Sequence, residues 1–238
     1  MSYTKRVDGR KFNQLRPIEA SAGVIERADG SAYFKIGNTV AYAAVYGPKS
    51  IPKHFQDPNS AKLRCYYSMM PFSGKGDRVR PGPNRRAKEI SMVTEKALLS
   101  VVDLSDYPNS AIDVYIALPQ TDAGTRCAGI SAASIALADA GIPMKDMISS
   151  VAVGRVDDKI VVDLCYGEEA YKGGPVADIP VAMTHRTKKI TLLQMDGLIT
   201  KEMFKEAVEK AKGAMDEIYE AQKNALKEKY KPIGEDDE

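Results

Sequence analysis

A short connection between two β-rich segments is the feature that most constrains the fold of this chain. Residues 31–36 and 39–46 are rich in strand-forming residues and are separated only by Gly37 and Asn38. A two-residue turn of this composition predicts a β-hairpin. Further strands are expected over residues 111–118, 150–156, 160–164, 179–183 and 190–194. The last four form two closely spaced pairs, which favours antiparallel neighbours.

Three helical patterns are interspersed with these strands. Residues 86–102 place apolar side chains on one stripe, and residues 131–140 are small and apolar until Gly141 and Pro143 end the segment. A Thr200 cap opens a last helix that is expected to run to about residue 230, ahead of an acidic tail at 234–238. This order predicts a single α+β domain over residues 1–238, with mixed or antiparallel sheets and packed helices, and not a doubly wound array. Residues 47–59 read as a long loop within the connection between the first hairpin and the first helix.

The bulk composition excludes several classes of protein. The chain has 238 residues, of which 44% are hydrophobic, so it can bury a substantial core. It lacks an apolar run of the length that a bilayer requires and an apolar secretory leader, which predicts a cytoplasmic address. Three widely spaced cysteines, Cys65, Cys127 and Cys165, favour reduced core residues over disulfides or a metal site.

Residues 121–126 have the composition of an anion-binding turn. Asp122, Gly124, Thr125 and Arg126 precede a segment of small residues that reads as a helix start. Glycine allows backbone amides to converge, a helix N-terminus offers unpaired N–H groups, and arginine adds a charged two-pronged donor. We therefore expect a phosphate there, with an ordinary turn and helix cap as the alternative.

Charge is concentrated in one segment although the net charge is only +2. Residues 75–88 contain six cations and one acid, including Arg85 and Arg86 at the predicted start of a helix. This distribution favours a focused polyanion site over a solvated loop, which remains the alternative. Acidic residues elsewhere, Glu168, Glu169 and Asp178, suit a divalent cation, so an RNA end, a phosphate and Mg²⁺ would fit together. The alternatives are exposed loop acids for the two glutamates and a buried strand cap for Asp178.

Eight short motifs together resemble the RNase PH family, in register from about residue 6 to residue 197. They are Asp8-Gly9-Arg10, Arg16-Pro17-Ile18, Ala28-Asp29-Gly30-Ser31-Ala32, Val45-Tyr46-Gly47-Pro48, Pro71-Phe72-Ser73, Arg85-Arg86-Ala87-Lys88-Glu89-Ile90, Gly124-Thr125-Arg126 and Ala177-Asp178-Ile179-Pro180-Val181-Ala182-Met183. The motifs around Arg85 and Asp178 are most similar to the catalytic ring subunit of the archaeal exosome.

The resemblance implies a ribosomal-protein-S5-domain-2-like βα fold and a phosphorolytic 3′→5′ exoribonuclease. Inorganic phosphate would be the co-substrate that releases nucleoside diphosphates, and the reverse reaction would add a tail to RNA. Relatives form six-membered rings. In the archaeal exosome three catalytic subunits alternate with an inactive paralogue beneath an RNA-binding cap.

The same resemblance implies roles for individual residues. Gly124, Thr125, Arg126 and Arg86 would bind phosphate, and Arg85 together with Arg86 would hold the RNA backbone. Asp178 matches one of two active-site aspartates and would bind Mg²⁺ or polarise the leaving 3′ oxygen. The second aspartate departs from the family pattern: Glu169 takes its place if a short insertion follows, whereas an ungapped count lands on Lys172. No catalytic histidine is required, because phosphate is already an anionic nucleophile.

Arg64, Lys53 and His54 are further candidates for RNA binding, because cations along a channel attract the phosphate backbone regardless of sequence. Tyr66 or Tyr67 would be placed to stack on a base, although ordinary strand packing explains them equally well.

Two other functions remain open from the sequence. The first is a homohexameric RNase PH that trims tRNA by the same chemistry. The second is a non-catalytic RNA-binding scaffold of the ring. The altered region at Glu169 favours the scaffold, whereas Gly124–Arg126 and Asp178 favour catalysis, because a scaffold has no use for a phosphate pocket.

Overall fold

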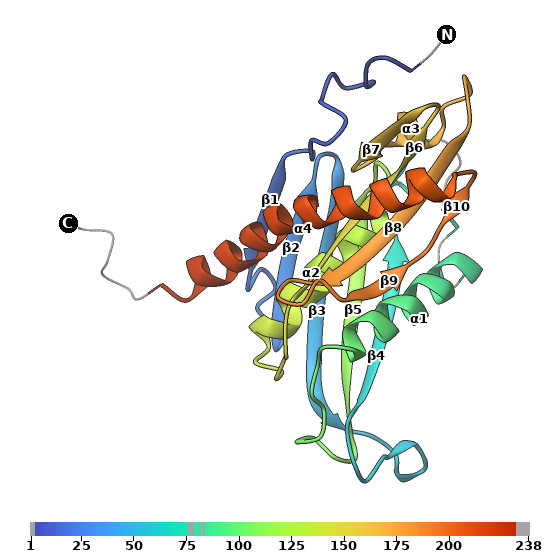
Figure 1. Cartoon of the computed structure of the whole chain (residues 1–238). Helices are drawn as coiled ribbons and strands as arrows, with labels where there is room; N and C mark the ends of the chain where they lie inside the picture. The colour runs from blue at the N-terminus through green and yellow to red at the C-terminus, as the bar shows by residue number, and fades with distance from the viewer. Residues whose placement is uncertain (1–2, 76–78, 81, 83, 232–238) are drawn as a thin grey trace, which may run out of the picture.

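The computed structural model describes residues 3–75, 79–80, 82 and 84–231, and these residues form two β-sheets with helices packed against them (Figure 1). The first sheet has the strand order β1-β2-β3-β5-β4. Its strands are β1 (Ile18–Ala22), β2 (Gly30–Ile36), β3 (Thr39–Ser50), β4 (Lys62–Met69) and β5 (Ser110–Gln120). The predicted hairpin is confirmed: β2 pairs antiparallel with β3, with Ile36 opposite Thr39.

The strand β4 corrects the sequence prediction of an unbroken connection between the first hairpin and the first helix. Leu63, Cys65 and Tyr67 alternate inward from β4, while Arg64, Tyr66 and Ser68 point outward. β4 pairs in parallel with β5 and forms the edge of the sheet. The preceding connection is also shorter than expected, because β3 runs to Ser50 and is followed by the 3₁₀ turn η1 (Lys53–Phe55).

The second sheet contains the two predicted antiparallel pairs. Its order is β10-β8-β6-β7, with β9 also paired to β8. The strands are β6 (Ile148–Val156), β7 (Lys159–Val162), β8 (Val176–Thr184), β9 (Ile190–Leu193) and β10 (Asp196–Gly197). A one-turn helix, α3 (Tyr166–Glu169), lies between β7 and β8 in the chain.

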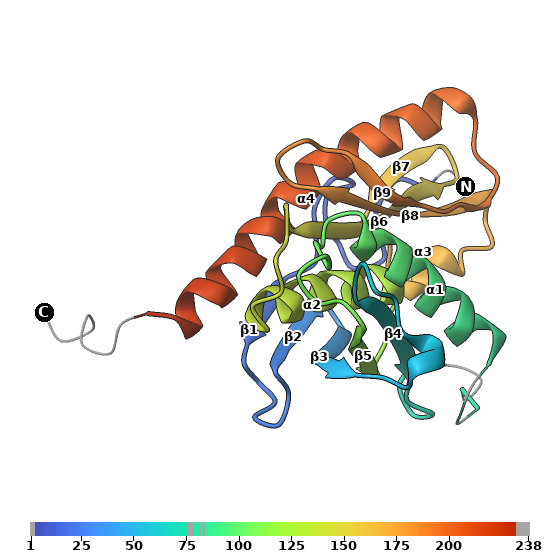
Figure 2. The same cartoon turned by 90° about the horizontal axis from the view of Figure 1, so that it is seen from below.

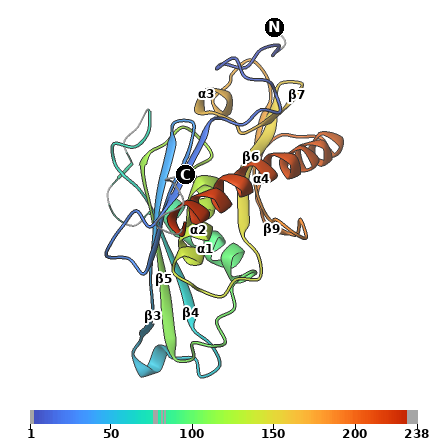
Figure 3. The same cartoon turned by 90° about the vertical axis from the view of Figure 1, so that its left-hand side faces the viewer.

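The longer helices lie on one side of the first sheet (Figure 3). Helix α2 (Thr125–Asp139) is buried almost throughout and lies between β2 and β3 of the first sheet and β6 of the second (Figure 2). Helix α1 (Arg85–Leu99) packs on β4 and β9, and α4 (Lys201–Lys229) packs along β6 and β1. The predicted Thr200 cap is confirmed, since its hydroxyl accepts the N–H of Met203.

One hydrophobic core connects both sheets with α1, α2 and α4. Phe34, Leu98, Ile135, Ile179 and Ile218 all belong to it and are almost completely buried. The cysteines Cys65, Cys127 and Cys165 are free and buried, as predicted. No helix in the described ranges is long and apolar enough to cross a bilayer. The acidic tail at 234–238 lies outside the described residues.

Candidate active site

A cavity of about 960 Å³ lies where the N-termini of α1 and α2 meet α3, β8 and β10. Gly124, Thr125 and Arg126 line it from α2, and Arg86 lines it from α1. Glu169 and Asp178 line it from α3 and β8. Six of the residues proposed from the sequence to bind phosphate or a metal therefore line one cavity.

The N-terminus of α2 faces this cavity. The helix begins at Thr125, six residues before the start that the small-residue pattern predicted, so residues 125–127 form its first turn. Gly124 caps it with φ +63°, a left-handed conformation that glycine adopts without strain. Gly124 has no side chain that could cap the helix. The first N–H groups of a helix have no intrahelical partner and are therefore available to a ligand. This end of α2 is suited to an anion.

Arg126 is held at the cavity wall by two side chains from other elements. Its Nη1 lies 3.4 Å from Glu89 Oε1 on α1 and also donates to Gln194 Oε1, just after β9. Gln194 Nε2 in turn donates to Glu89 Oε1 at 2.6 Å. This arrangement fixes one edge of the guanidinium.

The two arginines at the start of α1 differ in placement. Arg86 is exposed to solvent and lines the cavity, whereas the adjacent Arg85 is exposed but is not part of the lining. Lys75 and Arg80 also line the cavity, so the basic segment contributes three cationic side chains to the lining, counting Arg86. Gly76, Asp77, Arg78, Pro81 and Pro83 of that segment lie outside the described residues.

The neighbouring glutamates of α3 point in different directions. Glu168 is completely buried and its carboxylate is bound by Arg6 and Tyr3. Glu169 instead lines the cavity. Neither is the exposed loop acid that the alternative interpretation required, and Glu168 is not available as a ligand. Lys172, reached by the ungapped count, is exposed and is not in the lining.

Asp178 is a half-buried residue whose carboxylate has an unusual environment. Its Oδ1 is buried and has no hydrogen-bond partner within the described part of the chain. Burial raises the pKa of Asp178 from 3.8 to about 6, and the charge of Asp196 adds to the rise, while Arg126 and Arg86 oppose it. An unpaired buried oxygen on a carboxylate whose charged form is disfavoured is available to a ligand that enters the cavity.

Glu169 is coupled to Asp178. The pKa of Glu169 is raised to about 7, first by burial and then by the negative charge of Asp178, while Arg86, the Gly124 N–H and Arg16 lower it. Gly124 is the N-cap of α2, and its left-handed turn precedes the first amides of that helix.

The two carboxylates fit a magnesium ion. Carboxylate oxygens are the ligands that Mg²⁺ prefers, and it is usually bound by one or two carboxylates together with water and substrate phosphates. The unpartnered Oδ1 of Asp178 and the raised pKa values of both acids are consistent with that use. Over the described ranges no group of three or more His, Cys, Asp or Glu residues could hold a metal by itself. Water and, when bound, substrate phosphates would complete the coordination.

Three predicted RNA-binding residues lie away from this cavity. Lys53 and His54 are exposed on η1, in the connection between β3 and β4 at the bottom of Figure 1, whereas α3 and β10 lie near the top. Arg64 stands on the outer side of β4 and binds the buried Asp113 through Nε at 2.6 Å and Nη2 at 2.9 Å. Lys49 contacts the same carboxylate. The tyrosines divide as strand alternation requires: Tyr67 is buried and lines the cavity, and Tyr66 is exposed and stacks on Tyr115 at 4.8 Å.

Several lining residues were missed by sequence reasoning. Glu89 and Gln194 position Arg126, Asp196 lies opposite Asp178 in the β10–β8 pairing, and Tyr166 contributes an exposed ring. Glu89 lies three residues after Arg86 on a segment already singled out, and residues at this spacing share a helix face, which was a usable signal. Gln194 and Asp196 carried none, because only the β8–β9–β10 pairing brings them to the cavity.

Comparison with known proteins agrees with this arrangement. Residues 14–143 match domain 1 of the 3′ exoribonuclease family, and residues 146–214 match domain 2. The chain therefore belongs to the RNase PH family of phosphate-dependent 3′→5′ exoribonucleases, and the predicted α+β fold class is confirmed.

Within this family, the chain is similar to named components of exosome complexes. The chain is 50% identical over 226 residues to the exosome complex component Rrp41 of Methanopyrus kandleri, covering 94% of this chain and 93% of that protein. It is 51% identical over 233 residues to Rrp41 of Thermococcus kodakarensis, covering 98% and 92%. The solved structure of rice Rrp46 superposes with a TM-score of 0.82 at 25% identity, covering 93% of this chain and all of that one.

Proposed function

We propose that this chain is the catalytic ring subunit of an exosome and that its cavity carries out RNA phosphorolysis. The observation that carries the proposal is that the α2 N-terminus, Asp178 and Glu169 line one cavity. This arrangement offers an anion site and a candidate cation site side by side. The close relatives named as exosome component Rrp41 support the assembly part of the proposal.

The residues divide the work by their chemistry. Thr125, Arg126 and Arg86 bind inorganic phosphate next to the terminal linkage of the RNA, and Gly124 shapes the turn that exposes the amides. A phosphate oxygen attacks the last phosphorus, the bond from that phosphorus to the 3′ oxygen breaks, and a nucleoside diphosphate leaves. The shortened RNA retains the 3′ oxygen as a hydroxyl. Positioning and charge neutralisation supply most of the rate enhancement in such a transfer.

Asp178 and Glu169 would hold Mg²⁺, which supplies charge neutralisation at the transferring phosphoryl group when it is bound. Asp178 alternatively polarises the leaving 3′ oxygen, and a carboxyl with a pKa of about 6 is suited to exchange a proton there near neutral pH.

The remaining cations would guide RNA. Arg85 lies beside the cavity on the first turn of α1 and holds the backbone near the 3′ end. Arg64, Lys53 and His54 lie farther along the first sheet and attract the strand before it reaches the cavity. In the assembly that we propose, this chain alternates with an inactive paralogue in a six-membered ring below RNA-binding cap proteins. The three free, buried cysteines support the expected cytoplasmic location.

The test is release of nucleoside diphosphate from polyadenylate with and without phosphate. The chain is assayed alone and after mixing with an RNase PH-like partner subunit. Phosphate-dependent ADP release that requires the partner supports the proposal. Full activity as a lone hexamer would instead support a homohexameric RNase PH, and RNA binding without any ADP release would support a scaffold.

A further inference from the structure

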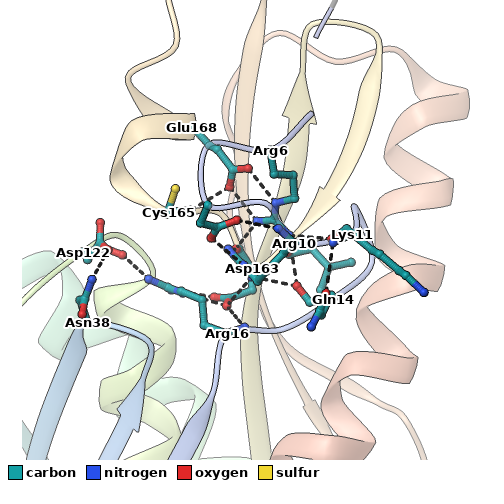
Figure 4. Close-up of polar contacts among 12 residues, drawn as sticks. Arg6, Arg10, Lys11, Gln14, Arg16, Asn38, Asp122, Asp163, Cys165 and Glu168 are labelled. Atoms are coloured by element: carbon teal, nitrogen blue, oxygen red, sulfur yellow. Dashed lines mark hydrogen bonds and ion pairs between the residues drawn. The ribbon is translucent and has the colours of Figure 1, made fainter. Parts of the chain in front are cut away.

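The N-terminal segment, residues 3–16, is bound to the part of the chain that carries Glu169. This segment contributes neither a strand nor a helix, and Figure 4 shows its arginines directed at Asp163 and Glu168. Arg6 is one of the largest fully buried side chains of the described residues. A buried arginine outside the cavity is costly unless every donor is used, so its partners reveal what it stabilises.

Arg6 uses its whole guanidinium on one carboxylate and four backbone carbonyls. Nε and Nη2 donate to the two carboxylate oxygens of Glu168, each at 2.7 Å. The other donors bind backbone carbonyls, those of Lys11 and Gln14 within the segment and those of Val162 and Asp163 at the end of β7. Arg6 thus joins the N-terminal segment, the end of β7 and α3.

The carboxylate of Glu168 is fully occupied. Besides Arg6, Oε1 accepts the Tyr3 hydroxyl at 2.8 Å, and Oε2 accepts the N–H of Cys165 at 3.0 Å. The hydrogen bond from Cys165 caps the N-terminus of α3, because Cys165 is the N-cap residue of this single turn. A four-residue helix has almost no stability of its own, so its orientation depends on these contacts.

Glu169 is the next residue, and its direction follows from that of Glu168. Successive side chains on a helical turn point about 100° apart, so anchoring Glu168 toward Arg6 directs Glu169 toward the cavity. The other end of α3 is fixed as well, because Tyr166 N–H donates to Asp122 Oδ1 at 3.1 Å. Arg16 joins Asp163 to Asp122. Its Nη2 donates to Asp163 Oδ1 at 2.6 Å, and its Nη1 donates to the Asp122 carbonyl.

We infer that Arg6 and Tyr3 are positioning residues for catalysis, which hold Glu169 opposite Asp178 by anchoring Glu168. The inference rests on the proposed role of Glu169 in binding the metal. Arg6 and Tyr3 then support the catalytic site from outside the cavity lining. Partners that orient a ligating carboxylate affect metal affinity or activity about 10-fold to 100-fold when they are removed.

The test uses Tyr3→Phe and the double variant Arg6→Met/Glu168→Met in the assembly in which the wild-type chain is active. Tyr3→Phe removes one hydrogen bond and keeps the ring that packs on Phe12 and Tyr171. The double variant replaces the ion pair by apolar side chains, which avoids leaving one buried charge unpaired. Arg10→Met is the matched control, because Arg10 binds Asp8 and Asp163 of the same network but not Glu168.

For the double variant we expect kcat to fall about 10-fold to 100-fold and the Mg²⁺ concentration for half-maximal rate to rise. Tyr3→Phe is expected to change both in the same direction by a smaller factor. The KM for phosphate and the affinity for RNA stay unchanged, since Arg126 and the α2 N-terminus are not touched. Arg10→Met is expected to lower Tm without changing kcat or the Mg²⁺ requirement.

Two results would overturn the inference: wild-type kcat and Mg²⁺ requirement in Tyr3→Phe, or the same kcat loss in Arg10→Met. If the double variant does not fold, Tyr3→Phe alone decides. An inactive wild-type chain, or one indifferent to Asp178→Ala, would refute the proposed function instead, so the two failures are distinguishable.

Discussion

Asp178 and Glu169 reach one cavity from β8 and α3, and after burial it is the charge of Asp178 that raises the pKa of Glu169 to about 7. The pKa of Asp178 is itself raised to about 6, and the largest cause is burial. Two acids that titrate near neutrality at the same place are uncommon in a surface cleft and typical of functional sites. Their coupling makes the site sensitive to pH in a definite direction.

Divalent metal binding should strengthen as pH rises from 5.5 to 7.5. Protons compete with the metal for both carboxylates until the pH exceeds their pKa values, so we expect Mn²⁺ affinity to increase about 10-fold or more over this range. Calorimetry without RNA or phosphate measures it, because phosphate itself titrates there. Affinity independent of pH would contradict the coupled pair.

Asp178→Asn should stabilise the metal-free protein above pH 7. The folded-state pKa of Asp178 is raised, so its charged form is disfavoured in the fold, and the penalty is present above about pH 6 and lost as pH falls toward 3.8. A shift of about two units corresponds to an upper value of roughly 3 kcal/mol in the free energy of unfolding. Urea unfolding at pH 8 and pH 4.5 tests the sign, with the exposed Asp106→Asn as control. Equal effects at both pH values would be inconsistent with a raised pKa.

Arg126→Ala should raise the KM for phosphate by about 10-fold to 100-fold, the range expected for lost charge-assisted hydrogen bonds. RNA affinity should be mostly retained. Glu89→Gln should give a smaller increase, because Gln194 still holds the guanidinium. Steady-state kinetics with phosphate as the varied substrate separates these effects, with Lys88→Ala, exposed on the same helix as Arg86, as control. A loss of RNA affinity with unchanged KM for phosphate would count against the assignment.

Arg64→Ala should weaken RNA binding without altering the KM for phosphate, because Arg64 lies on the outer side of β4 and outside the cavity lining. Loss of one phosphate contact makes the slope of log affinity against log salt less negative by about 0.7 for a single strand. Fluorescence anisotropy at several salt concentrations measures the slope. Lys159→Ala, an exposed lysine on β7, is the control, and an identical result for both variants would remove Arg64 from the RNA path.

The sequence predicted the elements best where local chemistry determines them. Gly37-Asn38 and the Thr200 cap act over a few residues, and both predictions are confirmed. β4 was missed because its partner, β5, lies more than forty residues away and pairs with it in parallel, which no local pattern reveals. The start of α2 was predicted late because Thr125 and Arg126 are ordinary turn residues as well as first-turn helix residues.

The candidate site shows the same division. Gly124, Arg126, Arg86 and Asp178 could be found from their motifs, and the cavity brings them together. The separation of Glu168 from Glu169 could not be predicted, because it depends on a buried arginine 162 residues earlier in the chain. Gln194 likewise acquires its contact with Arg126 only through the pairing of β9 with β8.

The central claim is that phosphate and a metal-binding carboxylate pair meet at one place, and crystals soaked in orthophosphate and Mn²⁺ test it most directly. The account predicts a phosphate at the N-terminus of α2, contacting Thr125 and Arg126, and an anomalous Mn²⁺ peak between Asp178 and Glu169. A phosphate bound elsewhere, with no metal density at Asp178, would contradict it.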